Sequence, residues 1–172
     1  MKRILVPTDF SKHAEYALKV AAQIAKKNDG EIFLVHMLEL PTSGNDAISR
    51  AHDIPELMFF KNAAVAKLDD LMDADYLNGV KISRIIQFEM AFEGIIKNGE
   101  AHNADLIVMG SHGANGFQEM FIGSNTEKVV RNSDVPVLVI KREEDTFSAS
   151  KFVFASDFSD EIKKPFEKVV EF

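Results

Sequence analysis

The strongest constraint on the fold is an alternation of short apolar segments with longer segments of helical period. The apolar segments have strand length and little polar alternation, and they cover residues 3–6, 31–37, 81–87, 105–109 and 136–140. Strands of this kind are usually buried on both faces, as in a parallel sheet that helices cover. The segments between them carry apolar residues at helical spacing, and they cover residues 11–27, 55–72, 91–102 and 124–131.

This alternation predicts an α/β fold. Strands that follow one another through helices need right-handed crossovers, which produce an open parallel sheet with helices on both faces. Five strands and four helices fit within residues 1–141, so we predict one domain over that range. The pattern alone leaves the order of the strands in the sheet open.

Charge and composition exclude several classes of function. The 172 residues include 20 Lys and Arg against 27 Asp and Glu, which gives a net charge of −7. An acidic chain is poorly suited to non-specific binding of nucleic acids or anionic membranes. The absence of cysteine excludes disulfides and thiolate metal sites, and the five histidines lack metal-ligand spacing, so we expect no metal site. No apolar stretch reaches the roughly 20 residues of a membrane span, and the N-terminus lacks a signal peptide pattern. We therefore expect a cytoplasmic protein.

The last thirty residues break the pattern. Residues 142–150 are polar and are typical of a linker. Residues 151–159 then resemble residues 3–11 at an offset of 148, and Asp157-Phe158-Ser159 repeats Asp9-Phe10-Ser11. We interpret residues 151–172 as the first strand and part of the first helix of an incomplete second copy. The strand needs a partner for its backbone groups, so we expect it to join a sheet edge, in its own chain or by exchange with a second chain.

The most informative motif is a set of glycines after the fourth predicted strand. Gly110, Gly113 and Gly116 fall in the loop at the end of this strand, where glycine lets a ligand approach the main chain. Gly123-Ser124-Asn125-Thr126 then opens the next helix, whose free N–H groups and dipole favour an anion. Together they indicate a phosphate site, although the glycines could also serve only to shape a tight connection. The spacing is neither that of the phosphate loop, which needs a lysine before Ser124, nor that of the dinucleotide fingerprint.

Two further side chains near this motif have open roles. His112 lies inside the glycine loop and is a candidate phosphate contact, or else a residue that orders its own loop. Asp9 is a candidate ligand contact, a helix-capping residue, or both. His36 ends an apolar strand, where a hydrogen-bonded buried imidazole is more common than a ligand. Ser111 and Ser124 lack the partners of a catalytic triad, so no catalytic residue is assigned.

The spacing of Gly110, Gly113 and Gly123-Ser124 resembles the nucleotide-binding motif of the universal stress proteins. The resemblance extends in order over residues 2–141, through the segments 4–11, 34–37, 105–113 and 135–140. The tail is similar to the start of the second domain in tandem members. The chain departs from the family where Phe88-Glu89-Met90 replaces a common Gly-x-Pro turn, and where Met37 replaces the commoner valine.

The resemblance implies a Rossmann-like sheet with strand order 3-2-1-4-5 and a ligand crevice between the first and fourth strands. It implies that ATP is the ligand, with Mg²⁺ able to bridge its phosphates. The positions that match the adenine contacts are Pro7, Thr8, Asp9 and Met37. Those that match the ribose and phosphate contacts are Met109, Gly110 and Gly113, and the helix start that holds the phosphates matches Gly123, Ser124, Asn125 and Thr126.

We therefore expect a universal stress protein that binds ATP as a sensor or regulatory module in the stress response. One alternative is a slow ATPase on the same site, without a phosphate-loop lysine or an obvious general base. The other is a nucleotide-free module for dimerisation and interaction. Family members commonly pair through the fifth strand, so a homodimer through Val135 to Ile140, or pairing with a second repeat, is expected.

Overall fold

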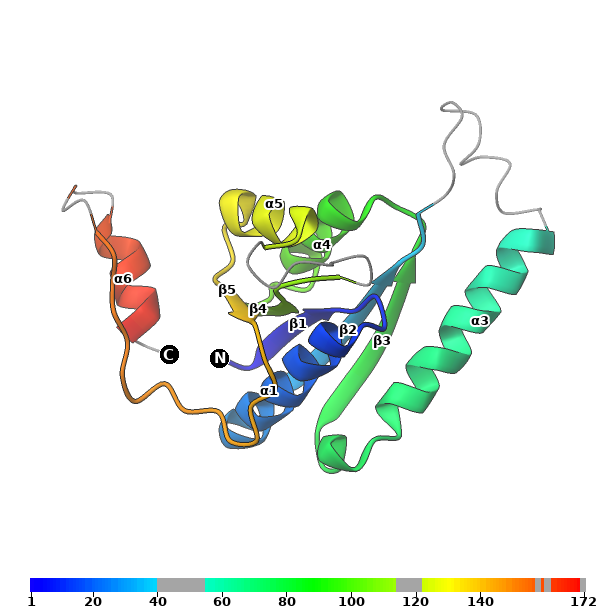
Figure 1. Cartoon of the computed structure of the whole chain (residues 1–172), viewed down its shortest axis with the longest axis horizontal. Helices are drawn as coiled ribbons and strands as arrows, with labels where there is room; N and C mark the ends of the chain where they lie inside the picture. Colours follow the sequence, from blue (N-terminus) through cyan, green and yellow to red (C-terminus); the bar gives the residue numbers. More distant parts are fainter. Residues whose placement is uncertain (40–54, 114–121, 157–158, 160–161, 171–172) are drawn as a thin grey trace.

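The computed structural model contains a five-stranded sheet in which every pair of neighbouring strands is parallel (Figure 1). The structure describes residues 1–39, 55–113, 122–156, 159 and 162–170. The strands run in the order β3-β2-β1-β4-β5, which confirms the expected topology. Their bounds are β1 (Arg3–Pro7), β2 (Glu31–Met37), β3 (Lys81–Gln87), β4 (Leu106–Gly110) and β5 (Val137–Ile140).

The helices begin and end within a residue of the positions that the sequence predicts. They are α1 (Lys12–Asn28), α3 (Pro55–Met72), α4 (Ala91–Ala101) and α5 (Ser124–Asn132), with a short 3-10 turn η2 (Asp75–Leu77) and a C-terminal α6 (Lys163–Val170). Ser11 caps α1, because its side chain accepts a hydrogen bond from the Ala14 N–H at 3.2 Å. Asp29 ends the helix in the left-handed region at φ 50°. Among the described residues, no helix combines the length and apolarity needed to cross a membrane.

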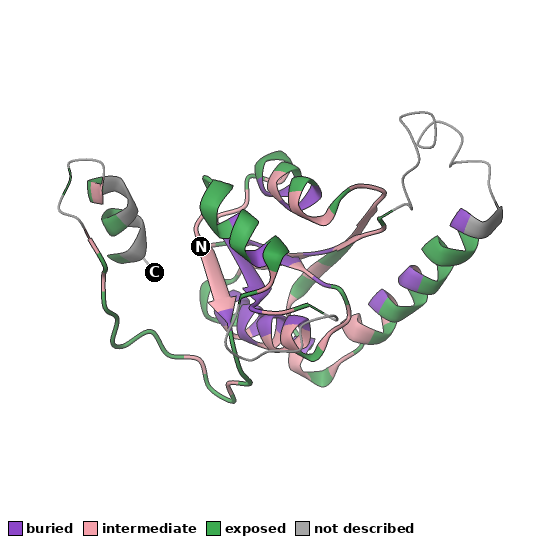
Figure 2. Ribbon diagram, turned by 45° about the horizontal axis from the view of Figure 1, so that its top comes forward, coloured by how far each residue is buried: buried purple, intermediate pink, exposed green. Residues whose placement is uncertain are grey.

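Two apolar clusters cover the two faces of the sheet (Figure 2). Successive strand residues point to opposite faces, so Ile4 and Val6 pack in the cluster that contains α1, while Leu5 packs in the cluster below α4 and α5. All five residues of β4 are buried, as expected for a central parallel strand. This arrangement places α1 on one face of the sheet and α5 on the other.

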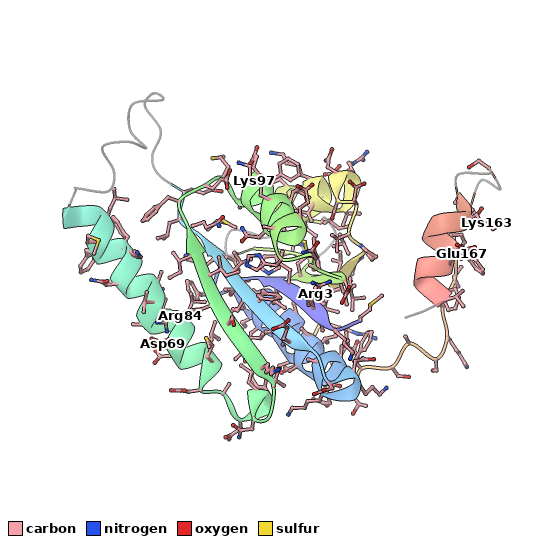
Figure 3. The ribbon with its side chains drawn as sticks, turned by 180° about the vertical axis from the view of Figure 1, so that it is seen from behind. Arg3, Asp69, Arg84, Lys97, Lys163 and Glu167 are labelled. Atoms are coloured by element: carbon pink, nitrogen blue, oxygen red, sulfur yellow. The ribbon has the colours of Figure 1, made fainter. Side chains whose placement is uncertain are left out.

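The edge strand β3 differs from the expectation of strands buried on both faces. Lys81, Ser83 and Arg84 are exposed, because α3 covers one face of β3 and no further strand lies beyond it among the described residues. Arg84 forms an ion pair with Asp69 of α3, and Figure 3 shows the two side chains together between strand and helix. Both side chains are partly exposed, so this pair stabilises the packing only weakly.

The segment after β5 is partly ordered against α1. As expected for a linker, residues 142–150 form neither helix nor strand. However, the Phe147 N–H donates to Gln23 Oε1 at 2.7 Å, and Lys19 forms an ion pair with Glu143. The ring of Phe147 packs against the α1 cluster. The first half of the linker is therefore fixed on α1, where its polar composition alone suggested flexibility.

The expected strand at residues 151–156 does not form within the single chain, and its exchange with a second chain stays a prediction. These residues form no strand and belong to no part of the five-stranded sheet, whose β5 edge is not extended by them. A strand needs a neighbour with free backbone groups, and the ordered linker leads the chain along α1 rather than along β5 (Figure 1). The helix expected after them is present as α6. Asp157 and Phe158 lie outside the described residues, and the second copy stays a prediction.

Asp105 ties the starts of β1 and β4 together. Its Oδ2 accepts the N–H groups of Lys2 and Arg3 at 2.8 and 2.9 Å, and its own N–H donates to the Arg3 carbonyl. Burial raises the pKa of the Asp105 carboxyl, but the two N–H donors and the positive charges of Arg3 and the N-terminus outweigh burial. The pKa therefore lies below its ordinary value of 3.8.

We predict that Asp105→Ala lowers the free energy of unfolding by about 1 kcal/mol at pH 7, because two charge-assisted hydrogen bonds of a half-exposed carboxylate are lost. The group's folded pKa is lowered, so its contribution is complete above pH 4 and disappears as the pH falls through the folded pKa. Urea unfolding of the wild type and of Asp105→Ala, at pH 7 and below pH 4, measures this difference in the free energy of unfolding. The matched control is Asp73→Ala, an exposed carboxylate, and equal stability of the two variants at pH 7 would contradict the prediction.

Candidate functional site

One cavity of about 520 Å³ opens at the carboxyl ends of β1, β2 and β4. All twelve residues selected from the sequence line it: Pro7, Thr8, Asp9, Met37, Met109, Gly110, His112, Gly113, Gly123, Ser124, Asn125 and Thr126. Its volume is within the usual range for ligand sites of proteins. It also lies at the switch point of the sheet, where the strand order reverses between β1 and β4. Gly116 lies outside the described residues.

The sequence did not identify six further lining residues: Ala14, Val35, His36, Glu39, Ala91 and Ile95. Val35, His36 and Glu39 come from the end of β2 and the loop after it, and Ala91 and Ile95 come from the start of α4. The carboxyl end of β2 was a usable signal, because loops after adjacent parallel strands meet at one edge of the sheet. The contribution of α4 could not be predicted in this way, because the helix that connects two parallel strands can lie on either face of the sheet.

The loop after β1 is held by hydrogen bonds to β2. The Thr8 N–H donates to the Val35 carbonyl and the His36 Nδ1 is hydrogen-bonded to the Thr8 carbonyl, both at 2.8 Å. His36 is therefore a hydrogen-bonded imidazole, as expected, and its ring also lies 4.5 Å from that of Phe10. Phe10 adopts φ 63°, a conformation that bulky residues rarely take, and the Phe10 N–H donates to Thr8 Oγ1. Strain of this kind is often found in loops at ligand sites.

Asp9 connects the loops after β1 and β4. Its Oδ1 accepts the Ser11 N–H at 3.0 Å, so it has the turn role that the sequence left open. A Cβ added to Gly113 would lie 2.7 Å from Asp9 Oδ2, which shows that the two loops touch here. Glycine at position 113 thus leaves room for the Asp9 carboxylate at the mouth of the cavity.

Gly110 lets α1 approach the end of β4. A Cβ at this position would lie 2.7 Å from the backbone carbon of His13, a distance that a side chain cannot reach without moving the helix. The Gly110 carbonyl accepts a hydrogen bond from Thr126 Oγ1 at 2.9 Å. Thr126 is 4% exposed, so its buried hydroxyl joins α5 to β4.

The first turn of α5 presents free N–H groups to the cavity. The Gly123 N–H donates to the Ser111 carbonyl at 2.8 Å, which fixes the helix start against the glycine loop. None of the described residues accepts a hydrogen bond from the N–H groups of Ser124, Asn125 and Thr126. Ser124 and Asn125 are exposed, so these donors and the Ser124 hydroxyl can reach a ligand.

Three helices contribute first-turn residues to this cavity, and they differ in whether a side chain caps the N-terminus. Ser11 caps α1, and the Glu39 carboxylate accepts the Ala91 N–H of α4 at 3.0 Å. The N-cap of α5 is Gly123, which has no side chain to accept a hydrogen bond. The positive end of the α5 dipole is therefore left for an external anion.

The opposite end of the cavity is apolar. Met37 packs into a notch at Gly94 of α4, where an added Cβ would lie 2.6 Å from Met37 Cε. Ala91 and Ile95 continue this wall, and Pro7 and Val35 complete the apolar lining. The methionine that departs from the usual family residue is thus accommodated by the glycine beside it. These side chains form the apolar slot of the cavity.

His112 is hydrogen-bonded within its own loop. Its Nδ1 lies 2.8 Å from Ser111 Oγ, and its ring is 5.2 Å from that of His13. This supports the interpretation that His112 orders the loop, while its place in the cavity lining keeps it within reach of a ligand. No group of three metal-ligating side chains occurs within the described parts of the chain.

Fold and site together define a Rossmann-like α/β domain with a switch-point cavity that has one apolar end and, at the other end, the start of α5 without a side-chain cap. The family model described as "Universal stress protein family" matches residues 1–141. The chain belongs to the universal stress protein family.

Known members support this assignment. Universal stress protein MJ0577 of Methanocaldococcus jannaschii is 34% identical over 154 residues, which cover 82% of this chain and 95% of that protein. Universal stress protein MJ0531 of the same organism is 33% identical over 142 residues and covers 82% of each chain. The solved structure of MJ0577 matches with a TM-score of 0.69 over 83% of this chain and 97% of that one. A universal stress protein solved in complex with cAMP has the same fold, with a TM-score of 0.60 and 22% identity over 81% of this chain and 96% of that one.

We predict that Thr126→Val lowers the free energy of unfolding by about 1–3 kcal/mol, because the buried Gly110 carbonyl loses its donor. Thr126→Ser keeps the hydroxyl and serves as the control, since it removes only a methyl group. Chemical denaturation of the two variants measures the difference. Equal stability of the valine and serine variants would show that the hydroxyl does not join α5 to β4.

Proposed function

We propose that this chain binds ATP in the switch-point cavity and acts as a nucleotide-dependent regulatory module in the stress response. The observation that carries the proposal is the uncapped start of α5, at the end of the cavity opposite the apolar slot. A nucleotide has the same polarity, with a flat base at one end and an anionic phosphate chain at the other. Mg²⁺ bridging the phosphates belongs to the same proposal.

The ligand would lie across the end of β1. Its base would fill the slot between Met37, Pro7 and Ile95, and its phosphates would meet the N–H groups of residues 124–126. The ribose and the first phosphate would lie close to the main chain of Gly110 and Gly113, because glycine has no side chain to keep them away. Binding energy on this proposal comes mainly from backbone donors, which need no lysine of the phosphate-loop type.

The fold itself is compatible with such a ligand. The universal stress protein that was solved with cAMP shares the sheet and its helices with this chain, although at 22% identity the likeness extends to the fold alone. ATP binding by this chain is therefore inferred from its own residues, which line a single cavity.

The direct test is to denature the purified protein, identify released small molecules by mass spectrometry, and titrate the emptied protein with ATP by calorimetry. We expect recovered adenine nucleotide or micromolar binding. Absence of both would contradict the proposal and leave the glycines as elements of architecture.

We predict that Gly123→Asp lowers the affinity for ATP by at least about tenfold, because an internal carboxylate would occupy the positive end of α5 and repel phosphate. A Cβ at this position would keep 3.4 Å from the Ser111 carbonyl oxygen, so the side chain can be accommodated. As an N-cap, the new residue should keep or raise the free energy of unfolding, by up to about 1 kcal/mol.

Gly123→Asn is the matched control, since it offers a neutral cap of the same shape. Its affinity for ATP should fall less than that of the aspartate variant, and the difference should shrink at high salt. If the wild type, Gly123→Asp and Gly123→Asn bind ATP with equal affinity at low ionic strength, the phosphates do not lie at the start of α5.

We further propose a homodimer that pairs at the edge strand β5. Val137 and Leu138 pack against the two core clusters, whereas Val139 joins neither of them and is half-buried. An apolar edge strand with spare backbone groups is a natural pairing site. We predict that the purified protein sediments as a dimer and that Val139→Glu shifts it towards the monomer. A wild-type monomer at micromolar concentration would contradict this.

A further inference from the structure

Glu39 is the one acidic side chain at the apolar end of the described cavity lining. The lining contains two carboxylates, and the other one, Asp9, lies by the glycine loop, where it accepts the Ser11 N–H. Glu39 follows β2 by two residues and is exposed, so a ligand in the apolar slot can reach it. Sequence reasoning did not select this residue.

A hydrogen bond holds the Glu39 carboxylate in a defined place. Its Oε1 accepts the Ala91 N–H at 3.0 Å, at the first residue of α4. Because Met90, the N-cap of α4, makes no side-chain cap, Glu39 supplies the acceptor from another segment. This hydrogen bond fixes the carboxylate beside Ala91, which also lines the cavity, and places it at the positive end of the α4 dipole.

This arrangement has two consequences for a ligand. A fixed negative charge at the start of α4 repels phosphate from that end, so the anionic part of a ligand is directed to the uncapped start of α5. Moreover, no described residue donates to the second oxygen of Glu39. A carboxylate oxygen at the rim of an apolar slot is an acceptor without a donor, and it will favour a ligand that supplies one.

On the basis of the proposed function, we propose that Glu39 is a specificity-determining residue that recognises an exocyclic amino group on the base of the bound nucleotide. The amino group donates to Glu39 Oε2, while Oε1 keeps its hydrogen bond to Ala91. A single free oxygen matches one amino donor, as on the 6-position of adenine. It matches less well the adjacent pair of N–H donors on guanine, which needs two acceptors side by side.

The test compares ATP with purine riboside 5′-triphosphate, which lacks only the 6-amino group. Titration of the emptied wild-type protein should show ATP binding about tenfold tighter or more, because a hydrogen bond to a charged acceptor is lost with the analogue. The informative variant is Glu39→Gln. Its amide oxygen can still accept the Ala91 N–H, and its NH₂ group then replaces the free acceptor by a donor. The ratio of the two affinities should fall to about two or less.

Glu93→Gln is the control, because it removes the same charge from an exposed side chain in the first turn of α4 outside the cavity lining. It should keep the wild-type preference for ATP. Thermal unfolding of both variants checks that α4 is intact, and a merely structural role of Glu39 would change stability without changing the ratio. Equal binding of ATP and the analogue to wild-type protein overturns this inference and leaves the proposed function standing. Binding of neither ligand overturns the proposed function itself.

Discussion

The reversal of strand order between β1 and β4 is the constraint on which the rest of the structure depends. The chain builds β1, β2 and β3 in one direction and then crosses back to add β4 and β5 on the other side of β1. The connections that leave β1 and β4 therefore lead to helices on opposite faces, α1 on one and α5 on the other. Among the described residues, no helix passes over the gap between the two strand ends, and the cavity opens there.

Hydrogen-bond satisfaction at the helix starts then gives this cavity its polarity. Every helix begins with unpaired N–H groups, and a side chain from elsewhere can satisfy them. Ser11 does so within α1, and Glu39 does so for α4 from the end of β2. No side chain of the described residues does so for the start of α5, whose Thr126 hydroxyl donates instead to the Gly110 carbonyl of β4. An anionic ligand is thus favoured at one of the three helix starts and disfavoured at another.

Close packing around glycine sets the shape of the site. Gly110 allows the backbone of α1 to lie against the end of β4, and Gly94 accepts the thioether of Met37. Gly113 leaves room for the Asp9 carboxylate between the two loops. Each of these glycines leaves room for a particular neighbour from a distant part of the chain. Gly110 and Gly113 are visible in the sequence as parts of a motif, while Gly94 is not, and the physical reason for each is visible only in the packing.

Much of the fold and of the site could be predicted from the sequence, since both depend on local patterns. Hydrophobic periodicity located the five strands and the four helices of the domain, and the family resemblance that begins with the glycine spacing led to twelve residues that line one cavity. The ordered linker against Gln23 and the missing strand at residues 151–156 were not predictable in this way. The pairing of a strand and the packing of a linker depend on which surfaces lie nearby in the folded chain, and the composition of a segment does not predict that.

By itself, then, the sequence determined which segments are strands and helices, where helices begin, and which loop can hold an anion. These properties follow from the side chains of neighbouring residues. Only the tertiary structure decided that the Thr126 hydroxyl donates to the Gly110 carbonyl and that Glu39 caps α4. It also decided that an apolar wall from α4 faces the start of α5. The physical reason is that hydrogen-bond partners and cavity walls are contributed by segments tens of residues apart, which the chain brings together only when the sheet is complete.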